Sequence, residues 1–151
     1  MLFEKVIDSP IGPLTLQGTA ESLTALRFGS TQAGGSSCPL LEEAARQLGE
    51  YFAGQRRRFA LPLSPAGTPF QRSVWCALQE VTYGQTASYR DIASRIGKPN
   101  ACRAVGMANH RNPLPILIPC HRIIASDGSL TGYAGGLAAK EFLLKLEKTF
   151  A

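Results

Sequence analysis

The chain has 151 residues, of which 44% are hydrophobic and 18% charged, with a formal net charge of +5. This length allows a sizeable core in one domain or two small ones, and the apolar fraction is typical of globular proteins. No apolar run reaches transmembrane length, and the N-terminal stretch with Glu4 and Asp8 lacks the basic start and long apolar core of a secretory signal. We therefore expect a cytoplasmic protein that does not enter the membrane.

The positive charge is confined to the second part of the chain. Residues 1–63 hold six Lys or Arg and six Asp or Glu, whereas residues 64–151 hold ten and five. This asymmetry is typical of a domain that binds a polyanion such as DNA, although a well-solvated basic surface would explain the charge alone equally well.

The N-terminal part is predicted to be a small α+β subdomain, residues 1–63. Residues 3–29 contain strand-like apolar runs separated by Pro and Gly turns, as in antiparallel hairpins, and residues 30–39 form an expected loop. Apolar residues at helical spacing over 40–52 predict an amphipathic helix that ends at Gly54.

The C-terminal part, residues 64–151, is predicted to be mostly helical. Apolar residues at helical spacing over 70–81 indicate a first helix. Ser88 and Asp91 then form a capping box for a second helix, which Gly97 stops, and a third helical stretch follows over 101–112. Two short helices around a tight turn favour a helix-turn-helix, a weak signal by itself.

The third helical stretch combines small residues with one long cation. It carries Gly106 and three alanines beside Arg103, and glycine inside a helix costs about 1 kcal/mol relative to alanine. Such a slim helix can approach another backbone closely. Tight protein packing explains the small residues equally well but gives Arg103 no role.

A cysteine and a histidine stand side by side after the apolar residues 116–119, which predict a buried strand. Only the thiolate of Cys120 would be nucleophilic, so it needs a base, for which His121 is the candidate, acting through a water because adjacent side chains diverge. Glu147, near the end of a predicted helix over 137–150, is the candidate carboxylate to orient the histidine. A Cys-His pair alone is more often structural than catalytic.

The motifs PILIPCHRII, RAVGMANHRNP and GSLTGYAGGLAAKEFLLKLE closely resemble those of the O6-alkylguanine-DNA alkyltransferases, also called methylated-DNA-protein-cysteine methyltransferases. The likeness extends to DSPIGPLTL and to TPFQRSVWCALQEVTYGQTASYRDIA, so it covers essentially the whole chain. It implies an α+β fold with a ribonuclease H-like N-terminal sheet and a helix-turn-helix C-terminal domain. It also implies DNA repair by irreversible transfer of the alkyl group from O6-alkylguanine, and from O4-alkylthymine, to a cysteine that reacts once.

The resemblance assigns roles residue by residue. Cys120 would accept the alkyl group, His121 would deprotonate it through a water, and Glu147 would orient His121. Asn112 would tie the active-site turn to this network. Tyr89 would donate a hydrogen bond or a proton toward guanine N3.

The resemblance also implies that the helix-turn-helix enters the minor groove and that Arg103 replaces an extruded base in the stack. The residues expected to contact DNA are Ser88, Arg103, Ala104, Gly106 and Arg122. The base pocket would be walled by Tyr133, Pro115 and Ile123, with main-chain groups near Cys120 and Ala134 reading guanine. Many relatives carry serine in place of Ala134, which removes a hydroxyl here.

The implied partner is double-stranded DNA bound by a monomer, and cooperative binding is left open. The four cysteines lie far apart, and some relatives hold zinc in the N-terminal domain, but residues 1–63 contain a single cysteine, Cys38, and no histidine. We therefore expect no metal and no cofactor, and reduced thiols.

Three other functions are compatible with parts of the sequence. A non-catalytic lesion sensor of the alkyltransferase-like kind would carry another residue, typically tryptophan, in place of Cys120. A cysteine hydrolase would leave Arg103 and the slim helix unexplained. A transcriptional regulator would leave residues 119–136 without a role.

Overall fold

The computed structural model describes residues 1–30 and 35–151, and residues 31–34 of the expected loop lie outside the described residues. The chain divides into two compact units, Met1–Ala66 and Gly67–Ala151. The first holds an antiparallel sheet with one helix and the second is mainly helical, so the predicted α+β class is confirmed. None of the helices in the described ranges has the length and hydrophobicity needed to span a membrane.

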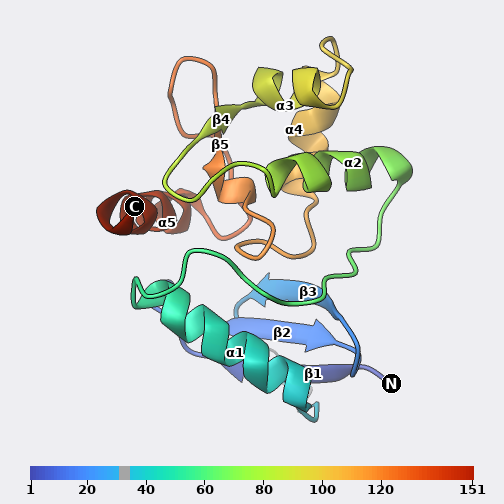
Figure 1. The fold of residues 1–151 in the computed structure, drawn as a ribbon, viewed down its shortest axis with the longest axis vertical. Coiled ribbons are helices and arrows are strands. Elements are labelled where there is room, and N and C mark those ends of the chain that lie inside the picture. Colours follow the sequence, from blue (N-terminus) through green and yellow to red (C-terminus); the bar gives the residue numbers. More distant parts are fainter. Residues whose placement is uncertain (31–34) are drawn as a thin grey trace. The chain divides into compact units, whose positions relative to one another are not determined.

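The first unit is a three-stranded antiparallel sheet packed against one helix (Figure 1). Its strands are β1 (Phe3–Ile7), β2 (Leu14–Gly18) and β3 (Leu23–Phe28), in the order β1-β2-β3. Strands β2 and β3 contribute the buried side chains of Leu14, Leu16, Leu23 and Leu26 to the core of this unit. Helix α1 (Pro39–Phe52) has proline in its first turn, contacts β1 and β2, and ends just before Gly54, whose φ is 76°.

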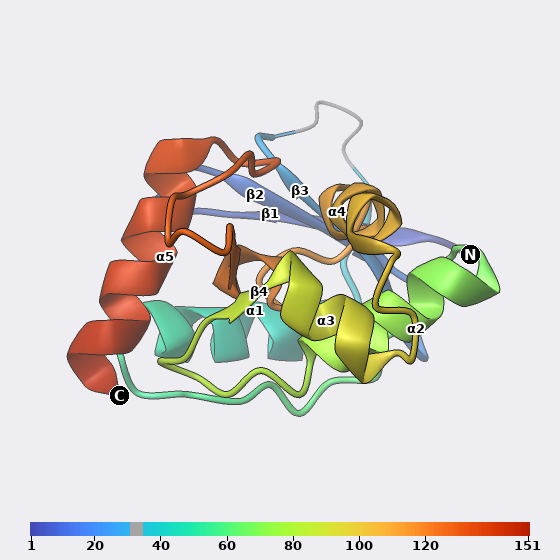
Figure 2. The ribbon, with the colours of Figure 1, turned by 90° about the horizontal axis from the view of Figure 1, so that it is seen from above.

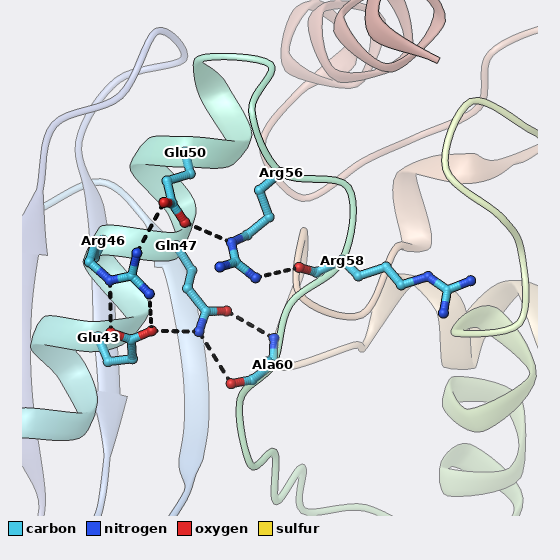
Figure 3. A network of polar contacts seen from close by, with 7 residues as sticks. All are labelled: Glu43, Arg46, Gln47, Glu50, Arg56, Arg58 and Ala60. Carbon is cyan, nitrogen blue, oxygen red and sulfur yellow. Dashed lines mark hydrogen bonds and ion pairs between the residues drawn. The ribbon is translucent and has the colours of Figure 1, made fainter.

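Gln47 fastens the segment after α1 back onto that helix (Figure 3). Its amide is 2% exposed, accepts a hydrogen bond from Ala60 N at 2.9 Å and donates one to Ala60 O at 3.2 Å. Arg56 adds an ion pair to Glu50 at 2.9 Å. A segment without helix or strand is thereby given partners for its backbone groups.

The second unit begins with α2 (Pro69–Leu78), whose capping box joins Thr68 and Gln71. Trp75 on α2 is buried and donates its indole hydrogen to Ala108 O at 2.8 Å. Val81 is buried but lies beyond the end of α2, so this helix is shorter than its apolar spacing predicted.

The next two helices form the expected helix-turn-helix. Ser88 caps α3 (Tyr89–Arg95) through the predicted capping box with Asp91. Gly97 then reverses the chain with a φ of 74°, and α4 (Cys102–His110) follows. Helix α4 packs against both α2 and α3 (Figure 2). The backbone geometry is therefore that of a helix pair around a tight turn.

The strand predicted over residues 116–119 is wrong. This segment is a buried turn in which Ile118 N bonds to Leu114 O at 2.8 Å, and Ile116 has a φ of 73°. Three nearby prolines, Pro113, Pro115 and Pro119, have no N–H to donate to a strand ladder, so the apolar side chains are buried by a folded turn instead.

The chain leaves this turn through a short 3-10 helix, η1 (Cys120–Arg122), and the strand β5 (Ile123–Ile124). Strand β5 pairs in parallel with β4 (Ala87–Ser88), the two residues that precede α3. The last helix, α5 (Leu137–Phe150), begins after Gly136 and contacts η1. The segment with Cys120 is therefore held between the start of α3 and one face of α5.

Candidate active site

Cys120 lies at the start of η1 and is 4% exposed. Its backbone N–H donates to Ile118 O at 2.7 Å, which fixes the turn before it. Burial raises the pKa of the Cys120 thiol to about 11, while a hydrogen bond with the Asn112 side chain and the charge of Lys140 act in the opposite direction. In this state the sulfur is a thiol at neutral pH, so a base is needed before it can act as a nucleophile.

His121 and Glu147 form a buried pair beside this cysteine. Nε2 of His121 lies 2.7 Å from Oε2 of Glu147, and the two residues are 0% and 1% exposed. Burial lowers the pKa of His121 below 6.5, although Glu147 opposes this shift. Nδ1 of His121 is buried and has no hydrogen-bond partner among the described residues. The ring is therefore neutral at pH 7, with a ring nitrogen left over to take part in chemistry.

Arg122 completes the surroundings of Glu147. Its Nε donates to Oε1 of Glu147 at 2.7 Å and its Nη2 to Oε2 at 3.0 Å, while Nη1 donates to Val81 O at 2.7 Å. Burial alone would raise the pKa of Glu147, but hydrogen bonds from His121 and Arg122 outweigh it and hold this pKa at about 2. Because the guanidinium is buried, the structure does not support the expected DNA contact for Arg122 and makes it the counter-charge of Glu147.

Asn112 links the turn to the cysteine. Its Nδ2 donates to Ile118 O at 2.9 Å and its Oδ1 accepts from Leu114 N at 2.9 Å. Both backbone groups belong to the buried turn, so the amide braces the segment that carries Cys120. Pro115 within this turn and Ile123 after η1 are also buried, whereas Ala134 is exposed.

The segment before α5 brings further groups to the site. The Tyr133 ring is buried and lies edge-on to the His121 ring, with centroids 6.5 Å apart. Lys140 on α5 is 0% exposed, and its Nζ donates to Ile123 O at 2.6 Å and Thr131 O at 3.4 Å. Burial lowers the pKa of Lys140, and the nearby Cys120 sulfur opposes that shift.

Sequence reasoning overlooked Lys140, although a signal for its burial exists. Lys140, Leu143 and Glu147 follow the three- and four-residue spacing of one helix face, and all three are buried. Two opposite charges on an otherwise apolar helix face indicate that their side chains are buried and make polar contacts inside the protein. The sequence also offered no signal for Thr131, whose hydroxyl contacts that of Tyr89.

Tyr89 connects this site to the helix-turn-helix. It is the first residue of α3, and a Cβ built on Gly106 of α4 would lie 3.8 Å from its ring. Arg103 and Ala104 of α4 are exposed, whereas the Ser88 hydroxyl is engaged in capping α3. A pocket of about 550 Å³ opens on this surface, lined by Tyr89, Cys102, Arg103, Gly106, Met107, His110 and Arg111.

The structure thus brings most of the expected residues into two adjoining groups. In one group, Asn112 is hydrogen-bonded to the Cys120 thiol, and the next residue, His121, is paired with Glu147. In the other, Arg103, Ala104 and Gly106 lie on α4. Within the described ranges, no group of three His, Cys, Asp or Glu side chains is arranged to hold a metal ion.

Known proteins match this chain over nearly its whole length. Residues 2–65 match the ribonuclease-like domain of 6-O-methylguanine DNA methyltransferase, and residues 69–149 match its DNA binding domain. A methylated-DNA-protein-cysteine methyltransferase of Methanosarcina barkeri is 52% identical over 157 residues, which cover 97% of this chain and 98% of that protein. A protein of the same name from Mycobacterium tuberculosis is 46% identical, over 100% of this chain and 95% of its own length.

Solved structures agree with the sequence matches. The crystal structure of the Mycobacterium tuberculosis O6-methylguanine methyltransferase superposes with a TM-score of 0.91 at 46% identity, covering 100% of this chain and 95% of that one. A structure of Mycobacterium tuberculosis OGT in complex with DNA gives the same TM-score at 47% identity, covering 99% and 94%. With both domains matched in order and a relative above 50% identity, the chain belongs to the 6-O-methylguanine DNA methyltransferase family.

Proposed function

We propose that this protein repairs double-stranded DNA by transferring the alkyl group of O6-alkylguanine, and of O4-alkylthymine, to Cys120. The observation that carries the proposal is the buried thiol placed next to a neutral His121 that Glu147 holds at 2.7 Å. The family membership and the DNA-bound relative from Mycobacterium tuberculosis support the substrate class. The product is a thioether, so each protein molecule reacts once.

His121 serves as the base in this reaction. A water between Sγ of Cys120 and Nδ1 of His121 passes the thiol proton to the imidazole, whose positive charge Glu147 then stabilises. Lys140 adds a second buried positive charge near the sulfur as the thiolate forms. Both effects favour the charged form of a thiol that burial otherwise keeps protonated.

The methyl group then moves in line from oxygen to sulfur. The S–C bond forms as the C–O6 bond breaks, and the electron pair of the broken bond stays on guanine. Tyr89 donates a proton toward N3 of the base, which neutralises this charge and makes guanine a better leaving group. Over the whole reaction, Cys120 loses one proton and guanine gains one. The His121 imidazolium releases the thiol proton to solvent, and Tyr89 regains its proton from solvent.

Base extrusion brings the alkyl carbon to the thiolate. Arg103 and Ala104 are exposed on α4, and Gly106 leaves that helix slim, which suits entry into the minor groove with Arg103 taking the place of the extruded base. The base enters a pocket walled by Tyr133, with main-chain groups at Cys120 and Ala134 reading its polar edge. A weakly paired alkylated base costs less to extrude than a normal one, which favours the lesion.

The walls around the alkyl group are Pro115 and Ile123. Both are buried beside the turn that carries Cys120, so they offer apolar surface to an alkyl substituent. The protein acts on DNA as a monomer in this scheme. Ser88 contributes through the N-terminus of α3, where it caps the helix that begins with Tyr89.

The test is the intact mass of the protein after incubation with a short duplex that contains O6-methylguanine. We expect the mass to rise by one methylene, saturating at one per molecule, and Cys120→Ala to gain nothing while still binding the duplex. Cys76→Ala removes an exposed thiol and is the matched control, which should react like the wild type. Lesion binding without a mass gain in the wild type would instead indicate a sensor, and repeated turnover would indicate a hydrolase.

A further inference from the structure

The side chain of Thr131 contacts Tyr89, and the proposed reaction assigns Thr131 no role. Its Oγ1 is hydrogen-bonded to the hydroxyl of Tyr89, a residue 42 positions earlier in the chain. Thr131 is half-buried in the segment between β5 and α5, and Tyr89 begins α3. The contact therefore joins the segment that walls the base pocket to the helix-turn-helix.

The backbone around Thr131 is anchored firmly enough to position that hydroxyl. The buried ammonium of Lys140 donates to Thr131 O at 3.4 Å and to Ile123 O at 2.6 Å. Ile123 is also paired in register with Ala87, two residues before Tyr89. One buried lysine thus ties the Thr131 segment to the strand pair that leads into Tyr89.

The ring of Tyr89 is held from the other side by α4. The tyrosine ring lies beside Gly106, 3.8 Å from where a Cβ would be, a distance of ordinary van der Waals contact. Gly106 limits the ring on one side and Thr131 meets the hydroxyl at its end. Tyr89 therefore has a defined position through its ring and its hydroxyl, and it also lines the pocket next to Arg103.

A hydroxyl carries one hydrogen to donate and can accept two, so the direction of this hydrogen bond matters. If Tyr89 donated to Thr131, its proton would be engaged and unable to reach a base. If Thr131 donates to Tyr89, the tyrosine proton is free to point into the pocket. The donated hydrogen bond also stabilises the negative charge that develops on the tyrosine oxygen as its proton leaves.

We propose that Thr131 is a positioning residue for Tyr89, donating its hydroxyl hydrogen to the tyrosine oxygen so that Tyr89 protonates N3 of the alkylated purine. This inference rests on the proposed function and extends it by one residue. Tyr89 gives its proton to N3 as the C–O6 bond breaks. Thr131 donates a hydrogen bond to the tyrosine oxygen throughout and keeps its own proton. Thr131 touches neither the base nor the alkyl group in this role.

The central variant is Thr131→Val, which keeps the shape of the side chain and removes the hydroxyl. We expect its single-turnover rate on an O6-methylguanine duplex to fall roughly ten-fold, the effect of one hydrogen bond to a developing charge. Thr131→Ser should recover most of the rate because it restores the hydroxyl. Ser129→Ala removes a hydroxyl from the same segment, where it bonds to Asp127 at 2.7 Å, and should react like the wild type.

A modified substrate separates this role from a structural one. In a duplex carrying 3-deaza-O6-methylguanine a carbon replaces N3, so no group is left for Tyr89 to protonate. On this substrate Thr131→Val and the wild type should react at the same reduced rate. Tyr89→Phe should show the same pattern, and the double variant should be no slower than Tyr89→Phe alone.

The outcomes distinguish the inference from the function on which it depends. If the wild type transfers no methyl group, the proposed function fails. If the wild type transfers it and Thr131→Val keeps the rate within about two-fold, the inference is overturned. An equal loss on the normal and the 3-deaza substrate also overturns it, because that loss would arise from altered folding of the segment.

Discussion

Glu147 holds His121 by the edge of the imidazole that carries Nε2, at a distance of 2.7 Å, and the buried Nδ1 has no hydrogen-bond partner among the described residues. The histidine is therefore oriented by a carboxylate on a different element, α5, and not by its own neighbours in the chain. The same carboxylate is shared with Arg122, so its charge is balanced before any proton is moved. Glu147 therefore both orients the His121 ring and has its own charge neutralised by Arg122.

Glu147→Gln should slow methyl transfer while leaving DNA binding largely intact. The amide keeps the size of the side chain but cannot stabilise an imidazolium, so we expect the single-turnover rate to fall by about two orders of magnitude. Rapid-quench measurement of methyl transfer tests this, with duplex affinity as the control. A variant that transfers as fast as the wild type would show that His121 needs no carboxylate.

The same substitution should lower the free energy of unfolding. It leaves the Arg122 guanidinium buried without a counter-charge, a change that costs about 3 kcal/mol or more in comparable pairs. In the wild type this contribution is present above the ordinary glutamate pKa of 4.5 and is lost as the pH falls toward about 2. Urea denaturation at pH 7 and pH 3 should therefore show a smaller difference between variant and wild type at the lower pH.

The pH dependence of methyl transfer should follow His121 and not the thiol. The base must be neutral, and burial lowers the pKa of His121 below 6.5, so the rate should be level near pH 7 and fall only at lower pH. Single-turnover rates between pH 5 and pH 9 test this. A rate that instead rises about ten-fold per pH unit toward the thiol pKa of about 11 would mean that Cys120 ionises without a base.

Local patterns predicted the helices well but not the buried polar groups. The capping box of Ser88 with Asp91 and the stop at Gly97 place α3 where the structure has it, because both signals are local in the sequence. The apolar residues 116–119 predict a strand but belong to a turn, because apolar side chains are buried in either structure. Here the missing N–H groups of three prolines decide against a strand.

The remaining site residues depend on contacts between segments that are distant in the sequence. Glu147 was a reasonable partner for His121, since a carboxylate near the end of an apolar helix needs a partner, and the two are in contact. Arg122 adjoins His121 in the chain and was assigned to DNA, but its guanidinium turns inward to Glu147 and Val81. The hydrogen bond between Thr131 and Tyr89 depends on how the chain folds, and no spacing in the sequence encodes it.

Arg103→Ala should impair repair within a duplex far more than reaction with a free modified base. The side chain is exposed on α4, and its proposed task, to fill the space of the extruded nucleotide, exists only in duplex DNA. We expect a loss of at least about ten-fold with the duplex and almost none with free O6-benzylguanine, both measured as protein alkylation. Lys145→Ala, an exposed cation on α5, is the matched control. Equal losses on both substrates would argue against base replacement.

Gln47→Ala should destabilise the first unit. The substitution removes two hydrogen bonds between the buried Gln47 amide and the Ala60 backbone, each of which contributes about 1 kcal/mol to stability. Arg46→Ala is the control, because it removes ion pairs to Glu43 and Glu50 on the exposed face of α1 and should change stability little. Denaturant unfolding followed by circular dichroism compares them. Equal effects would assign the stability to the surface ion pairs shown in Figure 3.

The burial of Lys140 makes its amine a chemical reporter of motion in the segment before α5. Acylating reagents modify a lysine amine only where they can reach its nitrogen. The closed segment denies that access, since Nζ is enclosed against Ile123 O and Thr131 O. Labelling of Lys140, followed by peptide mass mapping, would therefore depend on how often the segment opens, and a bound duplex that keeps it closed would slow the labelling.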